Sequence, residues 1–299
     1  MAHPMIFDRR LLRGRARRAL RMGPESFLLD AAARDLADRL SLVLRKFALA
    51  VDLGTATDAA RRALEGQVET IIATHPLAPG LVKDAALRVA ADEEALPFRD
   101  ASLDLVVSVL ALQFVNDLPG TLVQIRRALK PDGLFLAALL GGETLTELRQ
   151  AFAAAESEVE GGVSPRVAPF ADLRDLGALL QRAGFALPVT DAERVTVRYQ
   201  SVRALMHDLR RMGAGNALAE RRRTPLRRAT LVRMAEIYAE RFSDSDGRVR
   251  ATFDIVWLSG WAPDSAQQKP LAPGSARMRL ADALNTTEMP AGEKAGGGN

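Results

Sequence analysis

The sequence contains no cysteine in its 299 residues. Disulfide bonds, thiolate zinc sites, iron–sulfur clusters and cysteine nucleophiles are therefore excluded. Histidine is also scarce, because only His3, His75 and His207 occur, and their spacing matches no compact metal-binding motif. We expect no metal site, and the lack of cysteine suits a reducing compartment, so we predict a cytoplasmic location.

Long hydrophobic runs are missing as well. The richest apolar stretch, residues 133–142, is about half as long as the roughly 20 residues that a membrane-spanning helix needs. We therefore expect no integral membrane segment, and only peripheral contact with a membrane stays open.

The excess of positive charge is small. There are 41 Lys and Arg residues against 37 Asp and Glu residues, which gives a net charge of +4. Proteins that bind nucleic acid usually concentrate basic residues on one face, so we expect no such partner. Arginines nevertheless cluster at residues 9–21 and 221–228. Residues 1–45 are interpreted as a basic arm and a helix packed on the core, and the arm either contacts an acidic partner or forms a solvated helix face.

Apolar segments of strand length alternate with helical patterns through the first half of the chain. Predicted strands cover residues 47–54, 68–73, 87–90, 103–110 and 133–140, and predicted helices cover residues 26–45, 57–65 and 119–129. This alternation predicts a mainly parallel sheet with helices on both faces. The fold class is therefore α/β.

The second half of the chain continues this pattern with a helical interruption. Predicted helices cover residues 143–157 and 172–183, and predicted strands cover residues 185–189, 194–199 and 250–258. Residues 200–245 are helical and rich in arginine, which we interpret as an insertion over the carboxyl edge of the sheet. The core domain is placed at residues 46–284, and residues 285–299 are expected to be a disordered tail.

The turn after the first predicted strand is one candidate binding site. Ligands of open α/β sheets bind outside the carboxyl ends of the strands, where the strand order reverses. Residues 52–58 read Asp-Leu-Gly-Thr-Ala-Thr-Asp, and only Gly54 remains of a G-x-G-x-G pattern. Asp52, Gly54, Thr55 and Ala56 therefore form either a cofactor loop or a plain turn between strand and helix.

Residues 91–133 carry a more specific pattern. Asp92 and Glu93 are followed by Leu-Pro-Phe at residues 96–98, then by a Ser-Leu-Asp-Leu-Val strand and a Leu-Lys-Pro-Asp-Gly turn. In order and spacing these segments resemble class I S-adenosylmethionine-dependent methyltransferases. The resemblance implies a Rossmann-like sheet in which Asp92 contacts the adenine amino group and Glu93 shapes the adenine pocket. Ser108, in the strand that follows, is a further candidate for cofactor binding.

A narrower resemblance extends over nearly the whole chain, from residue 6 to residue 275. It rests on residues 175–185, on residues 206–216, and on the Ser-Gly-Trp-Ala-Pro and Gln-Gln-Lys-Pro segments that begin at residues 259 and 267. These segments are similar to bacterial relatives of the mitochondrial complex I assembly factor 5 family. That family is close to the malonyl-carrier-protein methyltransferase of biotin synthesis. Its mitochondrial member is regarded as an arginine hydroxylase, so the resemblance implies a protein substrate or a complex I subunit as the partner.

The sequence departs from active methyltransferases at two cofactor contacts. Active relatives end the second strand in an acid that binds the ribose, whereas Thr74 and His75 offer only neutral acceptors here. Ala56 adds a side chain beside the methionine part of the cofactor, and Asp58 places a negative charge near its carboxylate. We therefore expect binding of S-adenosylmethionine to be weakened or lost.

The sequence alone assigns no catalytic residue. His207, Tyr199 and Tyr238 are candidates for a base, and no set of two histidines and one carboxylate for oxygen activation is visible. A polar segment after the last strand either covers the sheet edge or contacts a substrate or partner. Its candidate residues are Trp261, Gln267, Gln268 and Lys269.

Two classes of function remain. The first is a methyltransferase-like enzyme that uses S-adenosylmethionine to modify a protein side chain in respiratory complex I assembly, or that acts on a carrier-bound acid. The second is a non-catalytic assembly factor that keeps the fold and has lost cofactor binding. The acidic pattern in residues 92–98 favours the enzyme, and the incomplete glycine loop favours the scaffold.

Overall fold

The computed structural model describes residues 5–76, 87–268 and 278–287. The chain divides into two units, Met1–Asp264 and Ser265–Asn299. The first unit holds the central sheet and the helices around it. The second unit contains the short helix α9 (Leu280–Ala283).

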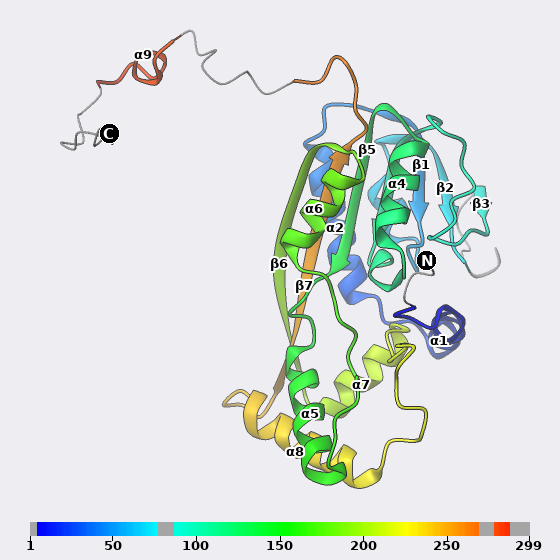
Figure 1. Ribbon diagram of the computed structural model, residues 1–299, viewed down its shortest axis with the longest axis vertical. Coiled ribbons are helices and arrows are strands. Elements are labelled where there is room, and N and C mark those ends of the chain that lie inside the picture. Colours follow the sequence, from blue (N-terminus) through cyan, green and yellow to red (C-terminus); the bar gives the residue numbers. More distant parts are fainter. Residues whose placement is uncertain (1–4, 77–86, 269–277, 288–299) are drawn as a thin grey trace, which may run out of the picture. The chain divides into compact units, whose positions relative to one another are not determined.

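A seven-stranded sheet with the order β3-β2-β1-β4-β5-β7-β6 is the centre of the first unit (Figure 1). Its strands are β1 (Phe47–Leu53), β2 (Val68–Thr74), β3 (Leu87–Val89), β4 (Leu103–Val109), β5 (Leu129–Leu140), β6 (Ala186–Tyr199) and β7 (Val249–Trp261). The first five strands pair in parallel, whereas β7 pairs antiparallel with both β5 and β6. The predicted α/β fold with a mainly parallel sheet is confirmed. The strand order reverses at β1, which lies between β2 and β4.

Helices cover both faces of the sheet. On one face lie α4 (Leu118–Ala128) and α6 (Leu173–Arg182), and the other face is covered by α2 (Phe27–Ser41) and α3 (Ala59–Ala63). Successive residues of a strand point to opposite faces. Accordingly, Val106 of β4 belongs to the apolar core under α4 and α6, whereas Leu105 and Val107 belong to the core under α2.

The edge strand β6 is continuous, although the sequence predicts two shorter strands there. Its pairing with β7 runs from Ala186 to Tyr199 with one irregularity near its start. The middle of the strand is polar because its side chains bind other side chains at the surface. Asp191, for example, accepts two hydrogen bonds from Arg39, at 2.7 and 2.8 Å. The backbone hydrogen bonds to β7 continue through this polar middle segment, because they do not depend on the type of side chain.

Four further helices lie beyond the carboxyl ends of the parallel strands (Figure 1). They are α1 (Arg9–Met22), α5 (Thr146–Glu160), α7 (Val202–Arg211) and α8 (Arg228–Phe242). A 3₁₀ turn, Leu112–Phe114, follows β4 on the same side. No helix in the described part of the chain is long and apolar enough to span a bilayer.

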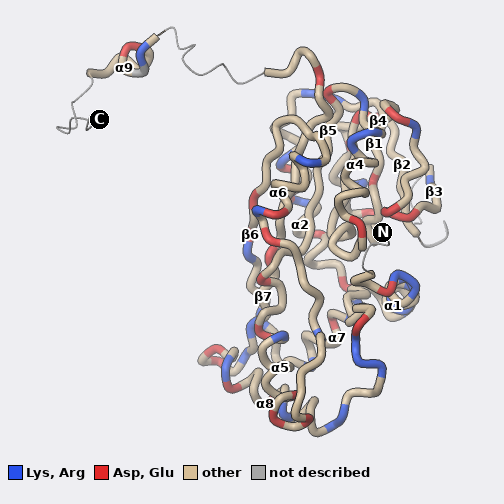
Figure 2. The backbone as a smooth tube through the Cα atoms, viewed as in Figure 1, with Lys and Arg blue, Asp and Glu red and all other residues tan. Residues whose placement is uncertain are grey.

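Helix α1, half of whose residues are arginine (Figure 2), pairs with a distant part of the chain. Asp8 caps the helix by accepting a hydrogen bond from the Leu11 amide at 2.9 Å. The amide of Asp8 donates to the carbonyl of Ala217 at 2.8 Å, and the amide of Ala219 donates to the carbonyl of Ile6 at 2.8 Å. The N-terminal segment is thereby tied to the segment that follows α7.

Candidate functional site

A cavity of about 440 Å³ lies at the carboxyl ends of β1, β4 and β5. Ala56 follows β1, Gln113 follows β4 and Leu140 ends β5, and all three line the cavity. The opposite walls come from α1, α7 and the segment after α7. This is the switch point of the sheet, where ligands of α/β proteins bind.

The loop between β1 and α3 depends on Gly54. Gly54 has a φ of +76°, and a Cβ atom at this position would lie 2.8 Å from Oε1 of Glu93 and 3.0 Å from the Cβ of Ala111. The amide of Gly54 donates to the carbonyl of Thr74 at 2.9 Å. Glycine therefore allows the loop to pass close to the predicted adenine pocket.

We expect Gly54→Ala to lower the free energy of unfolding by about 1–3 kcal/mol, because alanine is strained at positive φ and its Cβ would overlap with Glu93. Denaturant unfolding measures this loss. Gly66→Ala is the matched control, since Gly66 has a φ of +78° but a Cβ atom there would meet no other described atom within 4 Å. Equal losses in the two variants would contradict the crowding at Glu93.

Asp52 and Thr55 bind other groups of the protein. Asp52 is 1% exposed, and its Oδ2 lies 3.0 Å from Nη1 of Arg61. Burial raises the pKa of Asp52 from 3.8 to about 6, although Thr55 and Arg61 lower it. Oγ1 of Thr55 accepts a hydrogen bond from the amide of Val109 at 3.2 Å, which joins the loop to β4. That these two residues also contact a cofactor stays a prediction.

The hydroxyl groups of Thr74 and Ser108 hold neighbouring strands together. Thr74 donates to the carbonyl of Asp52 at 3.1 Å, and Ser108 donates to the carbonyl of Leu53 at 2.7 Å. Each hydroxyl has thereby donated its only proton. His75, by contrast, lines the cavity together with Ala56. The end of β2 therefore contributes His75 to the wall of the cavity, and its contact with a cofactor stays a prediction.

The negative charge of Asp58 is compensated. Its Oδ2 lies 2.5 Å from Nη1 of Arg62, one helical turn further on. The expected repulsion between Asp58 and the carboxylate of a cofactor is weakened by this cation. One of the two departures from active methyltransferases is therefore smaller than the sequence indicates.

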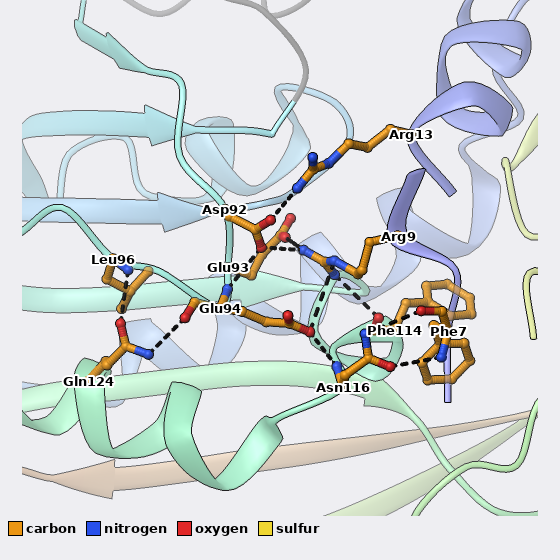
Figure 3. Close-up of polar contacts among 10 residues, drawn as sticks. All are labelled: Phe7, Arg9, Arg13, Asp92, Glu93, Glu94, Leu96, Phe114, Asn116 and Gln124. Atoms are coloured by element: carbon orange, nitrogen blue, oxygen red, sulfur yellow. Dashed lines mark hydrogen bonds and ion pairs between the residues drawn. The ribbon is translucent and has the colours of Figure 1, made fainter. Parts of the chain in front are cut away.

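The acidic turn, which comprises Asp92, Glu93 and Glu94, lies against α1 (Figure 3). Nη2 of Arg9 donates to Oδ1 of Asp92 at 2.5 Å and also to Oε2 of Glu93. Arg13 donates to the other oxygen of Asp92. Residues four apart on a helix share one face, so both arginines reach the same turn.

These contacts determine the charges of the acidic turn. Burial raises the pKa of Asp92, but the amide of Glu94 and the guanidinium groups of Arg9 and Arg13 lower it below its ordinary value. For Glu93, which is 5% exposed, burial outweighs Arg9 and raises the pKa. For Arg9, burial lowers the pKa, but the three acids raise it above its ordinary value. Arg9 is therefore a permanent cation in this turn.

Asn116 and Gln124 hold the acidic turn from its other sides (Figure 3). The backbone amide of Asn116 donates to Oε1 of Glu94, while its side chain binds Phe7. The amide of Phe7 donates to Oδ1 of Asn116 at 2.7 Å, and Nδ2 of Asn116 donates back to the carbonyl of Phe7 at 3.2 Å. Gln124 of α4 donates to the carbonyl of Glu94 at 2.9 Å and accepts from the amide of Leu96 at 3.0 Å. The turn is thus fixed between the N-terminal segment and α4.

The acidic turn keeps capacity for an adenine amino group. A carboxylate offers about four acceptor positions. Asp92 uses three of them, for Arg9, Arg13 and the amide of Glu94. One position remains. Of the predicted cofactor residues, Ala56 and His75 are among the described residues that line the cavity, whereas Gly54, Asp92 and Glu93 are not. The cavity and the remaining acceptor position of Asp92 fit a cofactor made of a nucleoside and an amino acid, such as S-adenosylmethionine.

Arg9 and Arg13 are site residues that the sequence pattern does not identify. The sequence predicts only that the arginines of residues 9–21 contact an acidic partner or solvent. The available signal is the spacing of four residues on one helix face. Their acidic partners lie 79 to 84 residues away, so no local pattern connects them.

The candidate bases lie away from the cavity. Tyr238 is buried and donates to the carbonyl of Arg250 at 2.7 Å, and burial raises the pKa of both Tyr238 and Tyr199. His207 is exposed, with Nδ1 at 3.7 Å from the carboxylate of Asp208. None of the three is among the described residues that line the cavity. The described residues also include no group of three or more His, Asp or Glu that could hold a metal ion.

The four candidate residues of the C-terminal segment do not lie in one unit. Trp261 ends β7 and pairs with Leu134 of β5. Gln267 and Gln268 belong to the second unit. Lys269 lies outside the described residues. That they contact a substrate or partner stays a prediction.

Comparison with known proteins agrees with this architecture. Residues 51–137 match the methyltransferase domain family. The mitochondrial arginine-hydroxylase NDUFAF5 of Danio rerio is 39% identical over 93% of this chain and 89% of its own. The malonyl-[acyl-carrier protein] O-methyltransferase of Laribacter hongkongensis is 36% identical over 80% of this chain and 84% of its own. A solved methyltransferase candidate from Bacillus halodurans is similar in fold, with a TM-score of 0.54 and 16% identity over 77% of this chain and all of its own.

Proposed function

The chain belongs to the family of the arginine-hydroxylase NDUFAF5 proteins, and we propose that it uses S-adenosylmethionine to modify a protein side chain during assembly of respiratory complex I. The observation that carries this proposal is the cavity at the switch point of the sheet, bounded by Ala56 after β1, His75 after β2 and Gln113 after β4. A bound cofactor would supply an electrophilic methyl group there. The name of the Danio rerio relative supports arginine as the modified residue type.

Each part of the site has a role in this proposal. Gly54, with its φ of +76° and no side chain, leaves room for the side chain of Glu93 and so brings the loop after β1 next to the acidic turn. Asp92 accepts the adenine amino group at its remaining acceptor position. His75 accepts a ribose hydroxyl in place of the usual carboxylate, which makes this contact weaker than in typical methyltransferases.

A non-catalytic assembly factor is the second candidate function. The observation that favours it is the pairing of Arg9 and Arg13 with the acidic turn, since this pairing uses most of the acceptor capacity of Asp92. A methyltransferase that acts on a carrier-bound acid is also supported, by the relative from Laribacter hongkongensis. A cytoplasmic location remains part of the proposal, whereas the Danio rerio relative is named as mitochondrial.

Asp92→Asn is expected to weaken binding of S-adenosylhomocysteine about tenfold or more, because a charged acceptor is replaced by a neutral one. Isothermal titration measures this affinity, after mass spectrometry has shown that no ligand co-purifies. Asp100→Asn is the control, because Asp100 is an exposed acid that pairs with Arg127 on the surface.

The outcomes separate the candidate functions. Binding to the wild-type protein that depends on Asp92 supports the enzyme. Equal affinity in the two variants would remove Asp92 from the adenine site. No binding of S-adenosylhomocysteine to the wild-type protein up to millimolar concentration would contradict the enzyme and favour the assembly factor.

A further inference from the structure

Arg15 of α1 lines the cavity, and the described residues leave part of its guanidinium group unsatisfied. Nη1 of Arg15 is buried, and it has no hydrogen-bond partner among the described residues. Arg9 and Arg13, on the same helix, both bind the acidic turn instead. A buried donor without a partner costs free energy. An acceptor group of a ligand would therefore supply the hydrogen bond that Nη1 of Arg15 lacks among the described residues.

The segment after α7 is shaped around this guanidinium group. A Cβ atom at Gly215 would lie 2.8 Å from Nη1 of Arg15. Gly213, with a φ of +74°, passes close to α1 as well, since a Cβ atom there would lie 3.4 Å from the Cα of Ala16. The glycine pattern of this segment thus gives room to α1, and at Gly215 it gives room to the Arg15 side chain itself.

The electrostatic surroundings of Arg15 are positive. Burial lowers the pKa of Arg15, and the like charges of Arg221 and Arg18 lower it further, while Asp8 only partly opposes them. Asp8 is itself paired with Arg221, whose Nη2 lies 3.3 Å from Oδ2 of Asp8. Arg18 and Arg210 line the cavity too. This wall of the cavity therefore attracts anions and disfavours cations.

The other walls of the cavity are largely apolar. They include side chains of the core under α2 and α5, such as Leu28, Leu140, Leu148, Phe152 and Phe253. A ligand that fills the cavity can therefore bury an apolar body while it presents a polar group to α1.

We propose that Arg15 binds a carboxylate or similar anionic group of a ligand whose apolar part fills this cavity. The inference rests on the proposed function only in taking the cavity as the ligand site. Two sources can supply the anion: the amino-acid end of the cofactor, or an acidic substrate. If the substrate residue is an arginine, we do not expect its cationic side chain to point toward Arg15.

The test compares Arg15→Gln with Arg10→Gln. Arg10 is exposed, lies on the same helix and is not among the described cavity residues, so its variant controls for the loss of one charge. Each protein is titrated with S-adenosylhomocysteine and with 5′-methylthioadenosine, which lacks the amino-acid carboxylate. Each is also titrated with octanoate and with octan-1-ol, its uncharged analogue. Arg15→Lys, which keeps the charge, is the second variant.

Two results would support the inference. If the cofactor supplies the anion, Arg15→Gln weakens binding of S-adenosylhomocysteine about tenfold or more and leaves 5′-methylthioadenosine unchanged. If a substrate supplies the anion, Arg15→Gln weakens binding of octanoate by the same factor and leaves binding of octan-1-ol unchanged. Arg15→Lys recovers part of the affinity in either case.

Other results would overturn the inference or separate it from the proposed function. It is overturned if Arg15→Gln and Arg10→Gln bind all four ligands alike, or if the wild-type protein binds neither S-adenosylhomocysteine nor octanoate. If octanoate binds in an Arg15-dependent way and S-adenosylhomocysteine does not bind, the anion site stands and the proposed use of the cofactor fails. Because Nη1 of Arg15 has no acceptor among the described residues, thermal unfolding of unliganded Arg15→Gln should be no earlier than that of Arg10→Gln.

Discussion

Arg9→Ala is expected to lower the free energy of unfolding by about 3 kcal/mol, because removal of one partner from a buried ion pair leaves the other charge unpaired. Glu93 is 5% exposed, and its carboxylate pairs directly with Arg9. Arg9 also joins α1 to the carbonyl of Phe114 at 3.2 Å, so its loss loosens the helix. Urea unfolding followed by circular dichroism measures the effect.

Arg10→Ala is the control for this variant. Arg10 is the next residue on α1 and is exposed, so we expect a change within about 0.5 kcal/mol. A second test removes the charge of Glu93 as well. Arg9→Ala combined with Glu93→Gln should be less destabilised than the sum of the single changes, since neutral glutamine needs no counter-ion. Additive losses would contradict a direct coupling between Arg9 and Glu93.

Glu156 of α5 binds the loop that forms one wall of the cavity. It is 0% exposed and accepts hydrogen bonds from the amide of Ser164 at 2.6 Å, from Oγ of Ser164 at 2.8 Å and from Nε of Arg166 at 2.7 Å. Arg166, Val167 and Phe170, which follow in the same loop, line the cavity. A single buried carboxylate therefore orders the loop that forms this wall.

We expect Glu156→Ala to lower the free energy of unfolding by about 3–5 kcal/mol, because it leaves the guanidinium of Arg166 and the amide of Ser164 without their acceptor. Denaturant unfolding measures the loss. Glu158→Ala is the matched control, two residues along the same helix. Glu158 is exposed and pairs with Arg233 at 2.6 Å, so its removal should lower the stability much less than removal of Glu156.

The contribution of Glu156 also depends on pH. Burial raises the pKa of Glu156, but the amide and hydroxyl of Ser164 and the guanidinium of Arg166 lower it below the ordinary value of 4.5. A carboxyl whose pKa is lower in the folded protein stabilises the fold above its unfolded pKa, and this stability is lost as the pH falls through the folded pKa. The stability difference between the wild-type protein and Glu156→Gln should therefore shrink below about pH 4.5. A difference that does not change with pH would show that the charge of Glu156 is unimportant.

The central strands could be predicted from the sequence because their signal is local. β1, β4 and β5 are buried on both faces, so their residues form apolar runs such as Leu103–Val109, and this strand is buried throughout. β6 lacks that signal, because Asp191 and Arg194 in its middle bind charged partners at the surface. The strand is continuous because its backbone pairs with β7, and the sequence of residues 186–199 alone does not predict that pairing.

Part of the candidate site also has a local signal. Asp92, Glu93 and Gly54 stand out in the sequence, and the structure places Glu93 next to Gly54; that they bind a cofactor stays a prediction. The roles of Thr74 and Ser108 in joining strands could not be read from their types, because a buried hydroxyl serves a ligand or a backbone carbonyl equally well. The partners of the arginines of α1 could not be predicted for a different reason. They depend on how the helix docks, and the docking involves residues that are distant in sequence.

The pairing of Ile6 and Asp8 with residues 217–219 has a consequence for synthesis on the ribosome. Ile6 and Asp8 emerge well before their partner, because residues 217–219 lie more than 200 residues further along the chain. Until then α1 can contact the acidic turn, but it lacks its backbone pairing with residues 217–219. Contacts between such distant segments form slowly, because a long loop must close first. We therefore expect helix α1 to dock late in the folding of a newly made chain.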